Sequence, residues 1–146
     1  PEYTNIMSYI TKNSLSHLVS IHRKVSDKFL SKQYRQHEIF ILANLMLENG
    51  DCEGAPNVLI EAAAHGLPSI AGEEGGTSDV VEHNKTGVLL DPRNTENLTT
   101  VMVDLLNDKT KLSTMRENGI LKVKLDHNKE KAGIKCKNYI LACIGR

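Results

Sequence analysis

The chain has 146 residues, of which 40% are hydrophobic and 25% are charged, so it can form one globular domain with a hydrophobic core. Its net charge is zero, but residues 43–108 carry 2 basic and 12 acidic groups, whereas residues 109–146 carry 10 and 3. An acidic centre argues against a nucleic-acid groove there. Three cysteines are too few for a disulfide scaffold or a zinc site, and no apolar run approaches membrane-spanning length, so a cytoplasmic location is expected.

The first third of the chain predicts two helices and two strands. Apolar residues at helical spacing over 3–13 indicate a short amphipathic helix, and the run 18–22, Leu-Val-Ser-Ile-His, is typical of a strand. A helix capped at Ser26 or Asp27 is expected next, followed by a second apolar strand over 39–43. Apolar strands between helical patterns favour a parallel sheet covered on both faces.

The most informative stretch is 53–66, Glu-Gly-Ala-Pro-Asn-Val-Leu-Ile-Glu-Ala-Ala-Ala-His-Gly, in which a loop leads into an apolar helix. Pro56 and Asn57 are residue types that start helices, and Gly66 is the type that stops one. Glu61 is the only charge within the helical run, and its carboxylate must reach water or find donors because unpaired burial is costly.

Two carboxylates flank the start of this helix. Glu53 precedes it and Glu61 lies on it, with seven residues between them. A helix N-terminus offers free N–H groups and a partial positive charge, which suit a phosphate-bearing ligand. Carboxylates beside it can accept hydrogen bonds from sugar hydroxyls, and small residues such as Gly54 let a ligand approach the main chain.

The rest of the chain continues the alternation of strands and helices. The pair Gly75 and Gly76 precedes a short helix near Thr77 or Ser78, and it could be a tight turn. The other expected elements are strands over 66–71 and 86–92, a helix over 98–106 and amphipathic helices within 109–146. This order predicts a doubly wound α/β domain whose ligands bind at the carboxyl ends of the strands.

Ordered segments of this chain resemble the donor-binding signature of retaining GT-B glycosyltransferases of the family-4 type, the glycosyl transferases group 1. The matching segments are the strand 38–42, the signature 53–66, the strand 66–71, the double-glycine loop 75–81 and the closing strand 86–92. The resemblance implies an α/β fold with a Rossmann-like doubly wound parallel sheet, the truncated C-terminal half of a GT-B glycosyltransferase. Residues 1–146 would form its nucleotide-sugar-binding domain, incomplete on the N-terminal side, with C-terminal helices in 109–146.

The resemblance also assigns roles to individual residues. Glu53 would be catalytic and would contact hydroxyls of the donor sugar, the alternative being a solvated loop acid. Glu61 would bind the ribose hydroxyls, the alternative being a helix acid that merely reaches water. The other expected donor-binding residues are Gly54, Ala55, Pro56, Asn57, Val58, Gly75, Gly76 and, near the base, Val25.

Parts of the family pattern are altered or missing. Ala55 stands where an aromatic residue is often found, and Pro56 removes one N–H donor. Glu73 and Glu74 are unusual beside a diphosphate and are expected to face the acceptor or solvent. The two strands that open the family's C-terminal domain, with the arginine and lysine that hold the diphosphate, are absent from this sequence, as is the acceptor-binding N-terminal domain.

The function that the resemblance implies is transfer of a hexose from a nucleotide-diphosphate sugar to a glycan or lipid-linked acceptor, with retention, once the missing N-terminal part completes the enzyme. The chain alone should be inactive. The alternative is a non-catalytic module for sugar-nucleotide binding or assembly. No cofactor other than the donor substrate and no metal is expected, because the six histidines form no ligand-spaced pair. The basic face of 109–146 is either solvated or in peripheral contact with an anionic membrane.

Overall fold

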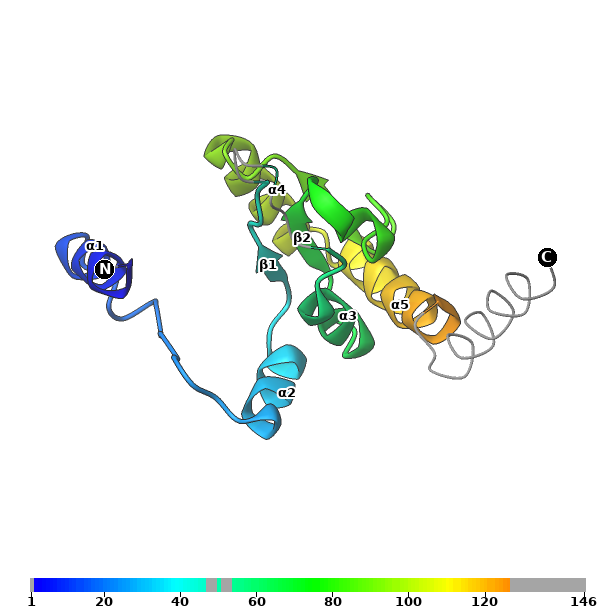
Figure 1. Ribbon diagram of the computed structural model, residues 1–146, viewed down its shortest axis with the longest axis horizontal. Helices are drawn as coiled ribbons and strands as arrows, with labels where there is room; N and C mark the ends of the chain where they lie inside the picture. The colour runs from blue at the N-terminus through cyan, green and yellow to red at the C-terminus, as the bar shows by residue number, and fades with distance from the viewer. Residues whose placement is uncertain (1, 47–49, 51–53, 127–146) are drawn as a thin grey trace. The chain divides into compact units, whose positions relative to one another are not determined.

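The computed structural model of the protein describes residues 2–46, 50 and 54–126 (Figure 1). The chain divides into two compact units, residues 1–30 and residues 31–146, and each is described here by itself.

The first unit contains α1 (Glu2–Lys12) and the start of α2 (Asp27–Gln36). Both helices were predicted, and Ser26 acts as expected, because its hydroxyl accepts a hydrogen bond from the Phe29 amide at 3.3 Å. Ile10 is the buried residue of α1.

The strand predicted over 18–22 is wrong. Leu18 lies in a turn, with its amide bonded to the Leu15 carbonyl at 2.9 Å, and residues 19–22 form no strand. The Leu18 side chain is 71% exposed. A strand requires a neighbour that pairs with its backbone and a surface that covers its apolar side chains, and within the described residues this segment has no such neighbour.

The second unit contains a parallel sheet of three strands in the order β1 (Phe40–Leu42), β2 (Ser69–Gly72) and β3 (Gly87–Leu90). All three lie where apolar runs predicted them. Phe40 pairs with Ser69, and Ser69 pairs with Gly87. Because the strands are parallel, their carboxyl ends share one edge of the sheet.

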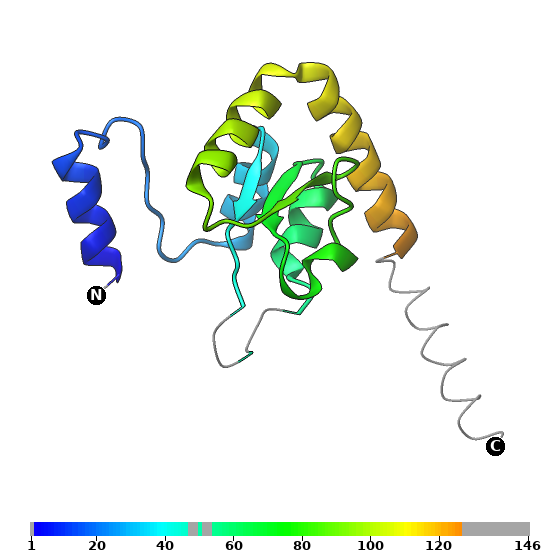
Figure 2. The same ribbon diagram turned by 90° about the horizontal axis from the view of Figure 1, so that it is seen from above.

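Successive residues of the strands face opposite sides of the sheet, and each side has its own core. On one side Ile70, Val88 and Leu90 pack with α4 (Thr95–Asn107) and α5 (Lys109–Asp126). The helices contribute three buried residues to this core, Leu105, Leu112 and Met115. Figure 2 shows α4 and α5 along this side.

On the other side the core is smaller. Ala71 of β2 packs with Leu59 of α3 (Asn57–Ala64) and with Val80, which follows the 3-10 helix η1 (Gly75–Asp79). Helices therefore cover both faces of the sheet, as expected for a doubly wound α/β domain. The helices predicted within 109–146 are confirmed as far as Asp126, and their remainder lies outside the described residues.

Candidate functional site

The loops that leave β1 and β2 pack tightly together at the carboxyl edge of the sheet. A Cβ atom at Gly72 would lie 2.0 Å from the backbone oxygen of Asn44, so only glycine fits at the end of β2. The Asn44 side chain then joins the two loops: its Oδ1 accepts from the Gly72 amide, and its Nδ2 donates to the Glu74 carbonyl, each at 3.2 Å.

Glu74 connects all three strand ends. Its carboxylate accepts a hydrogen bond from the Met46 amide after β1 and from the Arg93 guanidinium after β3, the latter at 2.8 Å. Arg93 also contacts Asp91 at 3.2 Å. The Arg93 hydrogen bond and the Met46 amide hold the pKa of Glu74 below its usual value. We predicted that Glu73 and Glu74 face acceptor or solvent; Glu73 is exposed, but Glu74 is tied to protein groups.

The glycine pair brings a second set of loops into contact. The helix η1 begins at Gly75, where φ is +74°, two residues before the predicted start near Thr77. A Cβ atom at Gly76 would lie 2.6 Å from the carbonyl carbon of Gly54 and 2.8 Å from the Ala55 nitrogen. The pair is therefore a turn that also lets two loop backbones touch, while its contact with a ligand stays a prediction.

The signature helix α3 starts at this contact. Pro56 is its N-cap residue and Asn57 is its first helical residue, so the predicted start of the helix is confirmed, and among the described residues no side chain caps it. Leu59 and Ala62 are fully buried and fix the helix against the core. The helix ends at Ala64, and Gly66, the residue predicted to stop it, follows two residues later with a φ of +72°.

Glu61 lies one turn along α3, where its carboxylate is both exposed to solvent and paired with a hydrogen-bond donor. Its side chain is exposed, and its Oε2 accepts a hydrogen bond from the Tyr34 hydroxyl of α2 at 3.3 Å. Burial of Tyr34, followed by the nearby charge of Glu61, raises the pKa of Tyr34 to about 12. The hydroxyl therefore stays a donor throughout the physiological pH range.

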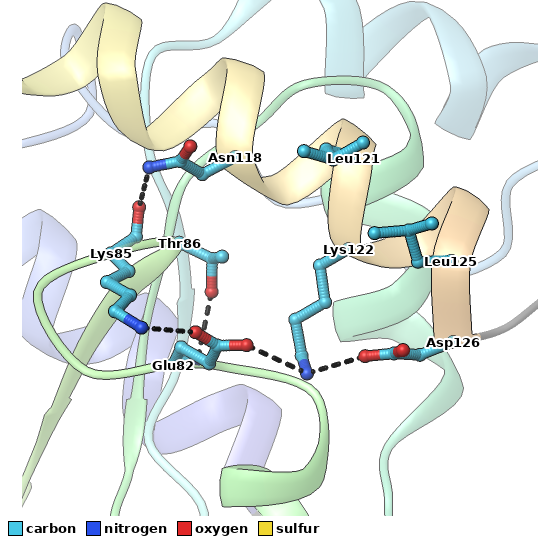
Figure 3. A pocket seen from close by; sticks show the side chains of 8 residues that line it. All are labelled: Glu82, Lys85, Thr86, Asn118, Leu121, Lys122, Leu125 and Asp126. Atoms are coloured by element: carbon cyan, nitrogen blue, oxygen red, sulfur yellow. Dashed lines mark hydrogen bonds and ion pairs between the residues drawn. The ribbon is translucent and has the colours of Figure 1, made fainter.

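A cavity of about 320 Å³ lies beside the entry to β3, against the last turns of α5 (Figure 3). Lys122 extends into it and bridges Glu82 at 3.2 Å and Asp126 at 2.9 Å, while Lys85 contacts Glu82 at 3.2 Å. Burial alone lowers the pKa of Lys122, but hydrogen bonds to the two carboxylates outweigh this and raise it. Because Thr86, which lines the cavity, precedes β3, the cavity lies at the amino end of that strand.

Comparison with known sequences decides the family of this domain. Residues 1–122 match the profile described as "Glycosyl transferases group 1". The chain belongs to this family. The expected Rossmann-like α/β fold of GT-B glycosyltransferases is thereby confirmed, whereas the retaining family-4 subtype is a prediction that stays untested.

This group 1 glycosyltransferase chain resembles longer proteins. It is 39% identical over 69 residues to the GDP-mannose-dependent alpha-(1-6)-phosphatidylinositol monomannoside mannosyltransferase of Mycobacterium tuberculosis. The aligned segment covers 47% of this chain and 18% of the mannosyltransferase. Among solved structures, the sucrose-phosphate synthase of Thermosynechococcus elongatus has a TM-score of 0.82 and 22% identity, over 99% of this chain and 35% of the other. The Anabaena protein HepE, solved with UDP-glucose, has a TM-score of 0.69 and 20% identity, over 84% of this chain and 32% of HepE.

The structure brings together most of the predicted donor-binding residues of the group 1 chain. Those at the carboxyl edge of the sheet or on the first turn of α3 are Gly54, Ala55, Pro56, Asn57, Val58, Gly75 and Gly76. Glu53 lies outside the described residues, so its predicted catalytic role is not tested. Val25 is 42% exposed in the first unit, and its predicted place near the base also stays a prediction.

Sequence patterns did not reveal three contributors to this site. Tyr34 was expected only as one residue of the helix capped at Ser26 or Asp27, although a buried tyrosine generally needs a partner for its hydroxyl. Asn44 and Arg93 each follow a strand, which is the one signal that could have indicated them.

Two properties of the described residues concern other classes of site. Among them, no group of three or more His, Cys, Asp or Glu residues is placed to hold a metal ion. None of the helices in this part of the chain is both long and apolar enough to cross a membrane.

Proposed function

We propose that this chain is the C-terminal, donor-binding domain of a glycosyltransferase that transfers a hexose from a nucleotide-diphosphate sugar to a glycan or lipid-linked acceptor with retention. The observation that carries this proposal is the contact between Gly76 and Gly54, which places the double-glycine loop against the entrance of α3. The mannosyltransferase relative is GDP-mannose-dependent, and the HepE structure contains UDP-glucose, which supports a nucleotide sugar as the donor.

The start of α3 suits the donor diphosphate. Gly54, Ala55 and Asn57 are exposed there, and no side chain of the described residues bonds to the first amides of the helix. Free N–H groups and the helix dipole stabilise the negative charge that develops on a departing diphosphate. We assign the ribose hydroxyls to Glu61 and the sugar hydroxyls, with the catalytic role, to Glu53. No cofactor other than the donor substrate enters this scheme.

Further components are needed for transfer. The chain spans 18% of the length of the mannosyltransferase it matches, so the activity of the whole enzyme is proposed for a protein completed by an acceptor-binding N-terminal domain. The two strands that open the family's C-terminal domain, which this sequence lacks, would supply the arginine and lysine for the diphosphate. A cytoplasmic location, with peripheral contact between the basic residues of 109–146 and an anionic membrane, accompanies this proposal.

The test uses the native full-length protein. Binding of GDP-mannose, UDP-glucose, GDP and UDP is measured by isothermal titration calorimetry, and the anomeric configuration of any transferred hexose is read by NMR. We expect Glu61→Ala to weaken nucleotide affinity roughly ten- to hundredfold, since it removes hydrogen bonds to a charged group. Glu53→Ala should abolish transfer while the nucleotide still binds.

Two outcomes separate the proposal from its rivals. Donor binding without hexose transfer to any glycan or lipid-linked acceptor would favour a non-catalytic sugar-nucleotide module. Absence of binding by the wild-type protein to all four compounds would exclude a donor-binding role altogether.

A further inference from the structure

The Tyr34 side chain is held rigidly at the interface between α2 and α3. It is 5% exposed, and its ring packs edge-on against Phe40 of β1, with ring centroids 5.8 Å apart and planes at 74°. It also packs against His65, with ring centroids 5.3 Å apart. These contacts restrict the ring, so the hydroxyl has a fixed place beside Glu61.

A second contact fixes the backbone that carries Glu61. The Nδ1 atom of His65 lies 2.8 Å from the carbonyl oxygen of Glu61, and a carbonyl oxygen only accepts, so Nδ1 carries a proton. The other ring nitrogen, Nε2, lies 2.9 Å from the Ser31 hydroxyl of α2. Both the main chain and the side chain of Glu61 are thus anchored toward α2.

The two oxygens of the Glu61 carboxylate have different surroundings. Oε2 accepts from Tyr34, whereas Oε1 has no hydrogen-bond partner in the part of the chain that the structure describes. The side chain as a whole is exposed, and it lies one turn after the start of α3.

We propose that Tyr34 is a positioning residue for donor binding: its hydroxyl holds Oε2 of Glu61 so that Oε1 is oriented to accept hydrogen bonds from the ribose of a nucleoside diphosphate. This inference rests on the proposed function, because it requires that Glu61 binds the nucleotide. Orientation of a flexible carboxylate before binding raises affinity, since less rotamer entropy is lost on association.

The test is a double-mutant cycle on the native full-length protein, with UDP and GDP as probes and isothermal titration calorimetry as the readout. Tyr34→Phe retains the packed ring and removes only the hydroxyl, and we expect it to weaken nucleotide affinity roughly three- to tenfold. In a Glu61→Ala background the same substitution should have no further effect, because the group through which Tyr34 acts is gone.

Two comparisons separate positioning from a general loss of structure. Ser31→Ala removes the contact to His65 that helps hold the Glu61 main chain but leaves the Tyr34 hydroxyl on Oε2, so it should weaken affinity less than Tyr34→Phe does. The 2′-deoxy forms of UDP and GDP lack a ribose hydroxyl, and with them the penalty of Tyr34→Phe should shrink. Thermal unfolding of every variant, followed by circular dichroism, reports stability separately from affinity.

The outcomes distinguish this inference from the proposed function. If neither nucleotide binds the wild-type protein, or if Glu61→Ala leaves affinity unchanged, the proposed role of Glu61 is wrong and the inference fails with it. If Glu61→Ala weakens binding but Tyr34→Phe does not, or if Tyr34→Phe weakens binding equally in both backgrounds, the positioning role alone is overturned.

Discussion

Gly76 shows how a single missing side chain shapes the candidate site. The nearest atoms to a Cβ built there belong to the backbone of Gly54 and Ala55, which cannot rotate away as a flexible side chain would. The identity of this residue therefore determines how closely the double-glycine loop approaches the entrance of α3.

Substitution of this glycine should separate the two loops. We expect Gly76→Ala to lower the free energy of unfolding by about 1–3 kcal/mol, as overpacking does elsewhere, and to weaken nucleotide binding. Urea unfolding measures the first effect, and calorimetric titration with UDP and GDP measures the second. Gly54→Ala is the matched control for stability, because a Cβ there meets nothing within 4 Å, and its change should stay within about 0.5 kcal/mol. Equal destabilisation by both substitutions would contradict the steric explanation.

Glu74 makes a pH-dependent contribution to the stability of the fold at the same edge of the sheet. The hydrogen bonds from Arg93 and the Met46 amide depress its pKa in the folded protein below the usual 4.5. A depressed folded pKa means that the stabilisation is present above the unfolded value and is lost as pH falls through the folded value. Glu74→Gln should therefore lower the melting temperature at pH 7, and the difference from wild type should shrink below about pH 4.5.

Thermal unfolding of both proteins between pH 3 and pH 8 checks this dependence. Glu73→Gln provides the comparison, because Glu73 is the exposed neighbour with the same charge. A difference between wild type and Glu74→Gln that stays constant across this pH range would show that the carboxylate charge does not contribute.

At the level of elements, the two ends of α5 differ in how deeply their side chains are buried. Its buried residues are Leu112, Met115 and Gly119, which lie in its first two thirds, while Leu121 and Leu125 near its end are 54% and 50% exposed. The first part packs against the core on the α4 side of the sheet. The end is instead held by ion pairs of Lys122, whose side chain is 14% exposed.

This difference in burial predicts that similar substitutions by alanine lower the free energy of unfolding by different amounts along the helix. Met115→Ala removes a 1% exposed side chain from the core and should lower the free energy of unfolding by about 2–5 kcal/mol. Leu121→Ala, on the same helix, should change it by no more than about 0.5 kcal/mol. Urea unfolding of the two variants compares them directly, and similar losses would mean that the end of α5 is covered in solution.

At the scale of the whole molecule, the sequence predicted those strands and helix ends that depend on a local pattern of residues. The three apolar runs became β1, β2 and β3, and Gly66 ended α3, because strand burial and a positive φ leave local signals. The run 18–22 carries the same signal, but a strand exists only with a partner, and pairing is not a local property.

The candidate site was predictable to the same extent. The signature and the double glycine were found from residue types and order. Their contact was not, because a glycine pair has the same local appearance in an ordinary turn and in a close approach of two backbones. The Tyr34–Glu61 pair was also missed, since it depends on how α2 packs beside α3. Such contacts are set by tertiary packing.

The contact between Gly76 and Gly54 also limits how this edge can evolve. Surface loops usually accept insertions and deletions, because added residues extend into solvent. Here the two loops abut through their main chains, with no side chain between them to yield. An added residue at this contact would displace the opposite backbone, so a change in length there must be matched on both sides. The turn at Asn84 and Lys85, which is exposed at the opposite end of β3, carries no such constraint.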